Sequence, residues 1–330
     1  MMTDTIEASE RDLMAQTLRR LAGRFDGEYL SKALADFGFG QLLEEAPREA
    51  VSALFDALGR TGSMSAELHD VLLQPLIGLF NGATEAHCVV LPRIGAAVSG
   101  SLDGGTVTLR GLVIGRRPTT VFLAPVTAGH DTAWVSVVDS TELTRRVVAG
   151  LDSALTVTDL SATGVAATVV AQGEQASNLW KAVATAGRRA LGYQIVGAVR
   201  AMLDLAVEHA RNRVQFGRPI GSFQAVRNRL AEAYVASEAA AAALELAWEA
   251  DDEYLAGMLA KSLAGRAARI TATHCQQVLA GIGFTAEHPF HRYLARALVL
   301  DSLLGSTTEL RRAIGRQLVS ARTIPRLVEL

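Results

Sequence analysis

Apolar residues in the first 82 positions recur at the spacing of an α-helix. Between Arg11 and Arg24, the positions that approximate one helical stripe are Leu13, Leu18, Leu21 and Ala22. Pro47 suits the first turn of a further helix. Another helical segment, residues 65–79, contains Pro75, which must kink or interrupt it because proline lacks the backbone N–H. We therefore expect an N-terminal helical domain over residues 1–82.

The pattern changes in residues 83–172, where short runs rich in β-branched residues are separated by Gly, Asp, Ser and Pro. The runs that we expect to form strands are residues 87–91, 106–110, 120–123, 133–138, 155–158 and 165–170. Between the first two runs, Asp103-Gly104-Gly105 is a turn signal. Strands of this length and spacing favour a small antiparallel β-barrel or sandwich as a central domain.

The helical period returns near Ala176 and continues to Arg213. A break containing Gly and Pro follows at residues 216–221. Ser222 is a plausible N-cap for the next helix because its side chain can accept a hydrogen bond from the first turn. The apolar residues that would line one face of this second helix are Phe223, Val226, Leu230, Ala233, Ala240 and Leu244.

Two further helices complete this C-terminal region. Asp251-Asp252 predicts the start of a third helix, which stops at the glycines after Ala280. Pro289 opens a fourth that reaches roughly Ala321. Four long helices with short links indicate an antiparallel bundle over residues 173–330. The fold class we expect is mostly α with a central β-domain.

Composition limits the classes of function. Charged residues make up 20% of the chain and hydrophobic residues 49%, which is typical of a globular protein. The formal net charge of -2 gives no basic excess for nucleic acid or an anionic membrane. The two isolated cysteines cannot form a disulfide framework, and we expect no metal site. Residues 1–7 lack a signal-peptide pattern and no apolar run reaches about 18 residues, so we expect a cytoplasmic protein without a membrane span.

The stretch from Arg213 to Gln224 reads Arg-Val-Gln-Phe-Gly-Arg-Pro-Ile-Gly-Ser-Phe-Gln. One interpretation is an ordinary turn between helices, with Arg213 as a solvated cation that suits the negative end of the helix dipole. The other interpretation is an anion site. An arginine at a helix end, beside the amides of a following helix start, can hold a phosphate group by charge-assisted hydrogen bonds.

This stretch resembles the R-x-x-F-G-x-x-I-x-x-F-Q signature of acyl-CoA dehydrogenases. Residues 277–285 are similar to the family's Q-x-x-G-G-x-G-[FY] motif, with Ala280 in place of the first glycine of the pair. Residues 287–294 resemble the segment that follows this motif in the family. The resemblance is strong from Ala176 to about Arg296, and weak before that.

The resemblance implies an FAD-dependent enzyme that desaturates acyl-CoA thioesters between Cα and Cβ. In this family the C-terminal bundle helps to form the dimer interface. Both motifs reach across that interface to the adenosine diphosphate half of FAD. Carried over by position, Arg213 and Gln224 would bind pyrophosphate or adenosine, and Phe216 would pack near the adenine. Gln277 and Gly281 would meet the diphosphate, since glycine lets backbone N–H groups approach closely.

The chain departs from the family at the catalytic base, which is a glutamate that removes the α-proton. The two positions at which relatives carry this glutamate align with Leu304 and Gly187, and neither residue can take a proton. Asp301 is a possible replacement, although a surface aspartate is the commoner role. The flavin-ring motifs of the β-domain also match poorly, at residues 82–85 and 112–115.

Three functions follow from this pattern. The chain could be the glutamate-lacking subunit of a heteromeric, α2β2 acyl-CoA dehydrogenase, as in bacterial enzymes that shorten steroid side chains. A glutamate-bearing partner would then supply the base, and the substrate would be an acyl-CoA, with a steroid side-chain CoA as one candidate. An electron-transfer flavoprotein or similar acceptor would reoxidise the FAD. Alternatively, it could be a self-contained homomeric dehydrogenase with an unusual base, or a non-enzymatic scaffold on the same fold.

Overall fold

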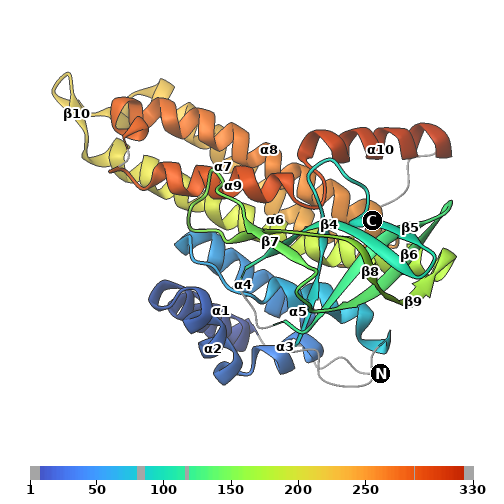
Figure 1. Cartoon of the computed structure of the whole chain (residues 1–330). Coiled ribbons are helices and arrows are strands. Elements are labelled where there is room, and N and C mark those ends of the chain that lie inside the picture. Colours follow the sequence, from blue (N-terminus) through green and yellow to red (C-terminus); the bar gives the residue numbers. More distant parts are fainter. Residues whose placement is uncertain (1–7, 80–85, 116–118, 286, 323–330) are drawn as a thin grey trace.

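The computed structural model describes residues 8–79, 86–115, 119–285 and 287–322, in which helices precede and follow a sheet (Figure 1). The predicted fold class, mostly α with a central β-domain, is confirmed. The signal-peptide expectation for residues 1–7 and the motif comparison at residues 82–85 lie outside the described residues. The domain boundaries at residues 82 and 172 stay a prediction, because one continuous apolar core includes side chains from the helices and from the sheet.

The N-terminal helices form where the sequence predicts them. They are α1 (Ala8–Arg24), α2 (Gly27–Phe37), α3 (Phe39–Glu45), α4 (Pro47–Thr61) and α5 (Leu68–Leu73), followed by the 3-10 helix η1 (Gln74–Leu79). Pro47 occupies the first turn of α4, as expected. Pro75 falls where α5 gives way to the 3-10 helix, so the predicted interruption is also confirmed. The predicted stripe of α1 is wrong at Leu13, which is 63% exposed, whereas Leu18 and Ala22 are buried.

The sheet contains nine described strands. They are β1 (His87–Val89), β2 (Leu91–Pro92), β3 (Gly100–Asp103), β4 (Thr106–Ile114), β5 (Val121–Ala128), β6 (Asp131–Val138), β7 (Thr144–Val147), β8 (Val157–Ala166) and β9 (Thr168–Gln172). Their main order is β7-β8-β4-β3-β5-β6-β9. The prediction of a purely antiparallel sheet is wrong, because β1 and β3 both pair with β5 in parallel. β4 pairs with one edge of β3 in antiparallel orientation, and β5 pairs with the other edge of β3 in parallel orientation.

Several strand predictions need correction, among them the run 87–91, which is divided between β1 and β2. β3 and β7 were not expected, since β3 lacks β-branched residues and all four residues of β7 are exposed. Backbone pairing with β4, β5 and β8 holds these strands, and side-chain type does not reveal such pairing. The run 165–170 is divided between β8 and β9, which part at Ala167.

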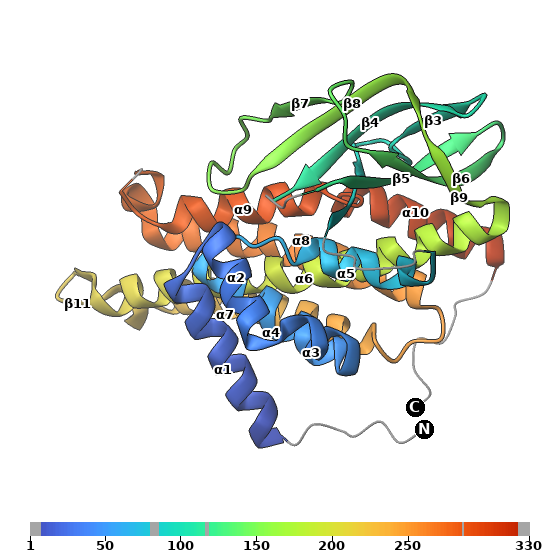
Figure 2. The same cartoon turned by 60° about the horizontal axis from the view of Figure 1, so that its bottom comes forward.

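Successive side chains along a strand point to opposite faces of the sheet, so the two faces contribute to two different apolar cores. On one face, a closed cluster within the sheet includes Val107, Leu109 and Phe122. On the other face, Leu112 and Trp134 join the core of the helices, and Trp134 Nε1 donates a hydrogen bond to Ala176 O at 3.2 Å. Figure 2 shows the sheet lying on one side of the helices, where this second face packs.

The C-terminal helices are α6 (Gly173–Asn212), α7 (Gln224–Leu246), α8 (Glu253–Leu279), α9 (Phe290–Ser302) and α10 (Thr307–Ala321). Helices α6 to α9 form the predicted bundle. The single helix predicted from Pro289 to Ala321 is instead two helices, because Leu304 and Gly305 adopt positive φ angles of 54° and 97°. A capping box of Ser306 and Glu309 then starts α10.

The link between α6 and α7 contains a small hairpin, β10 (Val214–Gln215) and β11 (Arg218–Pro219), and the 3-10 helix η3 (Ile220–Ser222). The prediction that Ser222 caps α7 is wrong. Phe223 is the N-cap residue and makes no side-chain hydrogen bond, because Ser222 is the last residue of the preceding 3-10 helix η3.

Helix α6 is the centre of the molecule. Among the described helices it alone is long and apolar enough to cross a membrane, but 78% of its apolar window is buried inside the protein. Helix α4 approaches it so closely that a Cβ added to Gly197 would lie 2.3 Å from Asp56 O. The apolar surface of α6 is therefore covered by this chain's own elements.

Candidate functional site

The two motif stretches meet at one end of the bundle. Figure 1 shows the β10 hairpin at the end of α6 and α7 that lies away from the sheet. Phe216, Phe223 and Gln277 line a cavity of about 330 Å³ there. The rings of Phe216 and Phe223 pack edge to face at 6.1 Å, and the Arg218 guanidinium lies 4.3 Å from the Phe223 centroid. Phe216 is 92% exposed, so this aromatic surface is open to a ligand or to another chain.

The remaining predicted cofactor residues surround this cavity without lining it. Arg213 caps the end of α6 and is exposed, and its carbonyl accepts a hydrogen bond from Ile220 N at 2.8 Å. Gln224 is the first residue of α7 and directly follows Phe223. Gly281 lies in the 3-10 helix η4 (Ala280–Phe284) that continues α8 beyond Gln277. All these positions are exposed, which leaves their polar groups available.

Arg213 affects the charge of one neighbour. The pKa of His209, in the last turn of α6, is lowered by partial burial and then by the nearby positive charge of Arg213. A neutral imidazole beside the guanidinium leaves the positive charge at this helix end on the arginines, Arg211 and Arg213.

The structure brings together Gly187 and Leu304, the two positions that the motif comparison aligned with the family's catalytic glutamate. Gly187 lies within α6, and Leu304 lies at the corner between α9 and α10. A Cβ added to Gly187 would be 2.4 Å from Leu304 Cδ1 and 2.8 Å from Leu72 Cδ2. One small region of space thus contains both positions, and apolar side chains fill it.

Buried cations hold this corner in place. Arg188 Nε donates to Leu304 O at 3.1 Å. Lys261 Nζ donates to Asp301 O at 2.9 Å and to Gly305 O at 2.8 Å. These donors satisfy carbonyls that are left free where α9 ends, and the positive charges suit the negative end of the helix dipole.

Lys261 is fully buried on α8. Burial lowers its pKa to about 7; the Asp301 carboxylate opposes this shift and the charge of Arg188 adds to it. No sequence pattern points to this residue, because a lysine between alanines and leucines in a helix usually lies on the surface.

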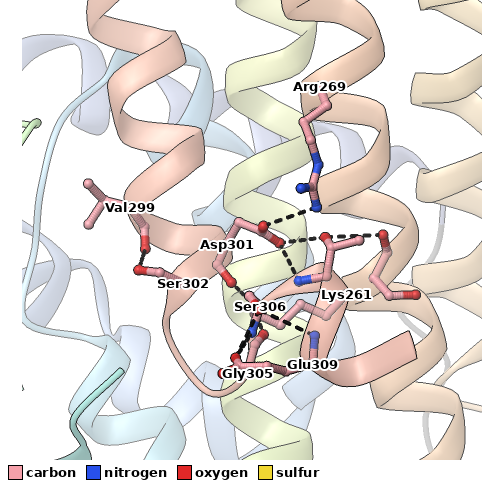
Figure 3. A network of polar contacts seen from close by, with 10 residues as sticks. Lys261, Arg269, Val299, Asp301, Ser302, Gly305, Ser306 and Glu309 are labelled. Atoms are coloured by element: carbon pink, nitrogen blue, oxygen red, sulfur yellow. Dashed lines mark hydrogen bonds and ion pairs between the residues drawn. The ribbon is translucent and has the colours of Figure 1, made fainter. Parts of the chain in front are cut away.

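Asp301, the candidate replacement base, is already engaged (Figure 3). Its Oδ1 accepts hydrogen bonds from Thr307 N at 3.1 Å and Thr307 Oγ1 at 2.6 Å. Its Oδ2 lies 3.4 Å from an Arg269 nitrogen. A Cβ at Gly265 would be 2.1 Å from Asp301 Oδ1, so the carboxylate packs directly against α8. This arrangement joins α8, α9 and α10 and does not present the carboxylate to a substrate.

The segment compared with the flavin-ring motif, residues 112–115, borders a second cavity. Leu112 and Leu303 face a space of about 500 Å³ between the sheet and α9. Its wall is chiefly aliphatic. Two of its charged residues, Arg93 and Asp159, form an ion pair of 2.8 Å with each other. Few free donors therefore remain for the heteroatoms of an isoalloxazine ring, whose electronics proteins tune by hydrogen bonding.

Comparison with known proteins identifies the C-terminal region. Residues 178–319 match the acyl-CoA dehydrogenase C-terminal domain family. The chain is 36% identical over 216 residues to acyl-CoA dehydrogenase FadE34 of Mycobacterium tuberculosis, covering 63% of this chain and 28% of that protein. It is 40% identical over 124 residues to acyl-CoA dehydrogenase IpdE2 of the same species, covering 38% and 39%. The chain thus spans less than two fifths of either relative's length.

Solved structures extend the likeness of fold over almost the whole chain. A Tcur3481-Tcur3483 steroid ACAD variant aligns with a TM-score of 0.81 at 19% identity, covering 95% of this chain and 99% of the other. The ChsE4-ChsE5 complex from Mycobacterium tuberculosis aligns with a TM-score of 0.77 at 23% identity, covering 98% and 100%. Motifs, sequence relatives and fold agree: residues 178–319 match the acyl-CoA dehydrogenase C-terminal domain family, and the chain as a whole has the fold of the solved acyl-CoA dehydrogenases.

Proposed function

We propose that this chain is a subunit of an FAD-dependent acyl-CoA dehydrogenase that contributes the adenosine-diphosphate side of a shared FAD site. A glutamate-bearing partner subunit contributes the base and the flavin-ring side. The observation that carries the proposal is the apolar contact between Gly187 and Leu304, because both family positions for the base coincide in space and neither holds a carboxylate.

The residues at the bundle end fit the adenosine half of FAD. When bound, FAD would accept the hydride that leaves Cβ of the acyl group. In this chain, Arg213 and Gln224 would bind the pyrophosphate or adenosine, and Phe216 would stack near the adenine. Gln277 and Gly281 would approach the diphosphate. Supporting this fit, Phe216 and Gln277 line one cavity, and the buried Ser222 Oγ beside it has no hydrogen-bond partner among the described residues.

The opposite end of the molecule fits a flavin ring poorly. The cavity beside Leu112 has an aliphatic wall, and its ion pair of Arg93 and Asp159 is internally satisfied. A chain that keeps one half of a shared site and lacks the other half requires a second chain to complete it. We therefore propose an α2β2 heterotetramer with one FAD per heterodimer.

The substrate that we propose is an acyl-CoA thioester, with a steroid side-chain CoA as the first candidate to test. Support comes from the likeness of fold to a Tcur3481-Tcur3483 steroid ACAD variant and to the ChsE4-ChsE5 complex. An electron-transfer flavoprotein or a similar acceptor would take the electrons from the reduced flavin.

The alternative of a self-contained homomeric dehydrogenase needs a base within this chain. Asp301 was the candidate, and its contacts with Thr307 and Arg269 oppose that role. The scaffold alternative predicts that no FAD is retained even with a partner present.

The proposal can be tested by purifying the chain alone and co-expressed with a glutamate-bearing acyl-CoA dehydrogenase subunit. Visible flavin absorbance and acyl-CoA oxidation with an artificial electron acceptor are measured on both preparations. We expect little flavin and no turnover from the chain alone, and about two FAD per heterotetramer with activity from the complex. One FAD per chain with robust turnover in the isolated protein would sink the proposal.

A further inference from the structure

Arg188 is a buried guanidinium that no described carboxylate balances. Its side chain is 7% exposed, and its Nε donates to Leu304 O at 3.1 Å. The guanidinium carbon lies 4.8 Å from the centroid of the Tyr254 ring. Its Nη1 is buried without a hydrogen-bond partner among the described residues. Burial of an unpaired charge with free donors is strongly unfavourable, so the site favours a bound anion.

A second buried cation lies close by. Lys261 is fully buried, and the positive charge of Arg188 is one reason, after burial itself, that its pKa is lowered. Its Nζ donates to the carbonyls of Asp301 and Gly305, and as a cation it cannot accept a hydrogen bond from Arg188. An anion beside Arg188 would stabilise both cations.

Arg188 lines a cavity of about 350 Å³ between α6, α8, α10 and the loop after β2. Trp180, Tyr254 and Met258 give this cavity an aromatic and apolar wall. Among its charged residues, Arg93 is neutralised by Asp159, whereas Arg316 and Glu309 carry opposite charges. The charge of Arg188 remains, which matches a single negative charge better than the two of a phosphate monoester.

We propose that this cavity binds a small monocarboxylate with a planar or apolar body. The carboxylate accepts hydrogen bonds from the guanidinium group of Arg188, whose Nη1 has no partner among the described residues, and the body lies against Trp180 and Tyr254. This site lies next to Leu304, at the other end of the bundle from the FAD residues proposed above. It therefore requires neither FAD nor the partner subunit.

Benzoate and its neutral isostere benzamide test the role of charge. The melting temperature of the full chain is measured while each is titrated. We expect benzoate to raise it by about 2–6 °C at ten times its dissociation constant, and benzamide to leave it unchanged. An equal effect of benzamide, a larger effect of inorganic phosphate, or no effect of benzoate would each overturn the proposal.

Two variants test the location without touching Arg188. Ala313→Trp fills the cavity from α10, and Ala239→Trp adds the same side chain at an exposed position on α7 outside the cavity. Benzoate binding, measured by calorimetry, should weaken at least tenfold in the first variant and stay within twofold of wild type in the second. Equal binding by all three proteins would place the ligand elsewhere and refute the proposal. Because no flavin is involved, these outcomes are separate from the test of the proposed function.

Discussion

At the residue scale, a buried lysine, Lys261, helps to hold the corner between α9 and α10 at Leu304. Lys261 is fully buried and donates hydrogen bonds to two carbonyls near Leu304, and burial lowers its pKa to about 7. In the unfolded chain its pKa is near 10.4. Below pH 7 both states carry the proton, whereas between pH 7 and 10 the unfolded state binds more protons. This lysine therefore makes the protein more stable as the pH rises through that window.

Replacing Lys261 with Met should remove this pH dependence. The contribution in wild type is at most about 1.4 kcal/mol per pH unit between pH 7 and 10. The variant should also lose about 1–3 kcal/mol at pH 7 because two carbonyls lose their donor. Urea unfolding at pH 7, 8 and 9 measures both effects. Lys181→Met, at an exposed position on α6, is the control, and an identical pH slope in wild type and Lys261→Met would contradict the prediction.

A second prediction at this scale concerns Arg213. If it binds the FAD diphosphate, Arg213→Ala removes a charge-assisted hydrogen bond that contributes about 1.5–3 kcal/mol, so FAD affinity should fall roughly ten- to hundredfold. The flavin content of the complex after dialysis measures this loss. Arg211→Ala, an exposed arginine in the same last turn of α6, should leave the flavin content unchanged. Equal retention of flavin in both variants would remove Arg213 from the site.

At the element scale, glycines set how closely α4 and α6 approach. A Cβ at Gly197 would lie 2.3 Å from Asp56 O, and one at Gly59 would lie 2.1 Å from Gln194 O. Both neighbours are backbone atoms, so no side chain can rotate away to make room. The N-terminal helices are positioned on the bundle by this contact between two glycine-bearing surfaces.

Gly197→Ala should therefore destabilise the protein by about 1–3 kcal/mol, since the helices must separate to admit the methyl group. Gly315 on α10 has nothing within 4 Å of its added Cβ. Gly315→Ala should instead stabilise by up to about 1 kcal/mol through helix propensity. Chemical denaturation of both variants measures the sign of the change in the free energy of unfolding. Equal changes in the two variants would refute the close-packing argument.

At the scale of the whole molecule, Arg296 joins all three groups of elements. It is 2% exposed on α9 and pairs with Asp152 in the loop between β7 and β8. Its other nitrogens donate to Ser63 O at 2.8 Å and Gly62 O at 3.0 Å, at the end of α4. One side chain thus connects the N-terminal helices, the sheet and the bundle.

Arg296→Met should cost about 3–5 kcal/mol, because it leaves the Asp152 carboxylate buried and unpaired. Arg146→Met removes a surface arginine that is 77% exposed and 3.5 Å from Asp159, and should change stability by less than about 1 kcal/mol. Thermal unfolding followed by circular dichroism compares the two. A shift in Arg296→Met no larger than in Arg146→Met would show that this connection is unimportant.

The sequence alone determined the order of the helical and β regions and the resemblance to acyl-CoA dehydrogenases. Helical period and β-branched runs depend on local side-chain patterns, so the helices after Pro47 and the strands near Val107 and Val135 could be located. The motif around Arg213 is contiguous, and therefore visible without a structure. The fourth bundle helix was misjudged, because the positive φ at Leu304 is stabilised by Arg188, which is distant in the chain.

Only the tertiary structure decided which residues far apart in the sequence lie next to each other. It showed that Gly187 and Leu304 are neighbours, that the Asp301 carboxylate contacts Thr307 and Arg269, and that Arg188 is buried with no carboxylate partner among the described residues. These relations join α6 and α8 to the corner between α9 and α10, through contacts between residues far apart in sequence. Local sequence patterns do not predict such contacts, since packing and burial depend on which distant segments the fold brings together.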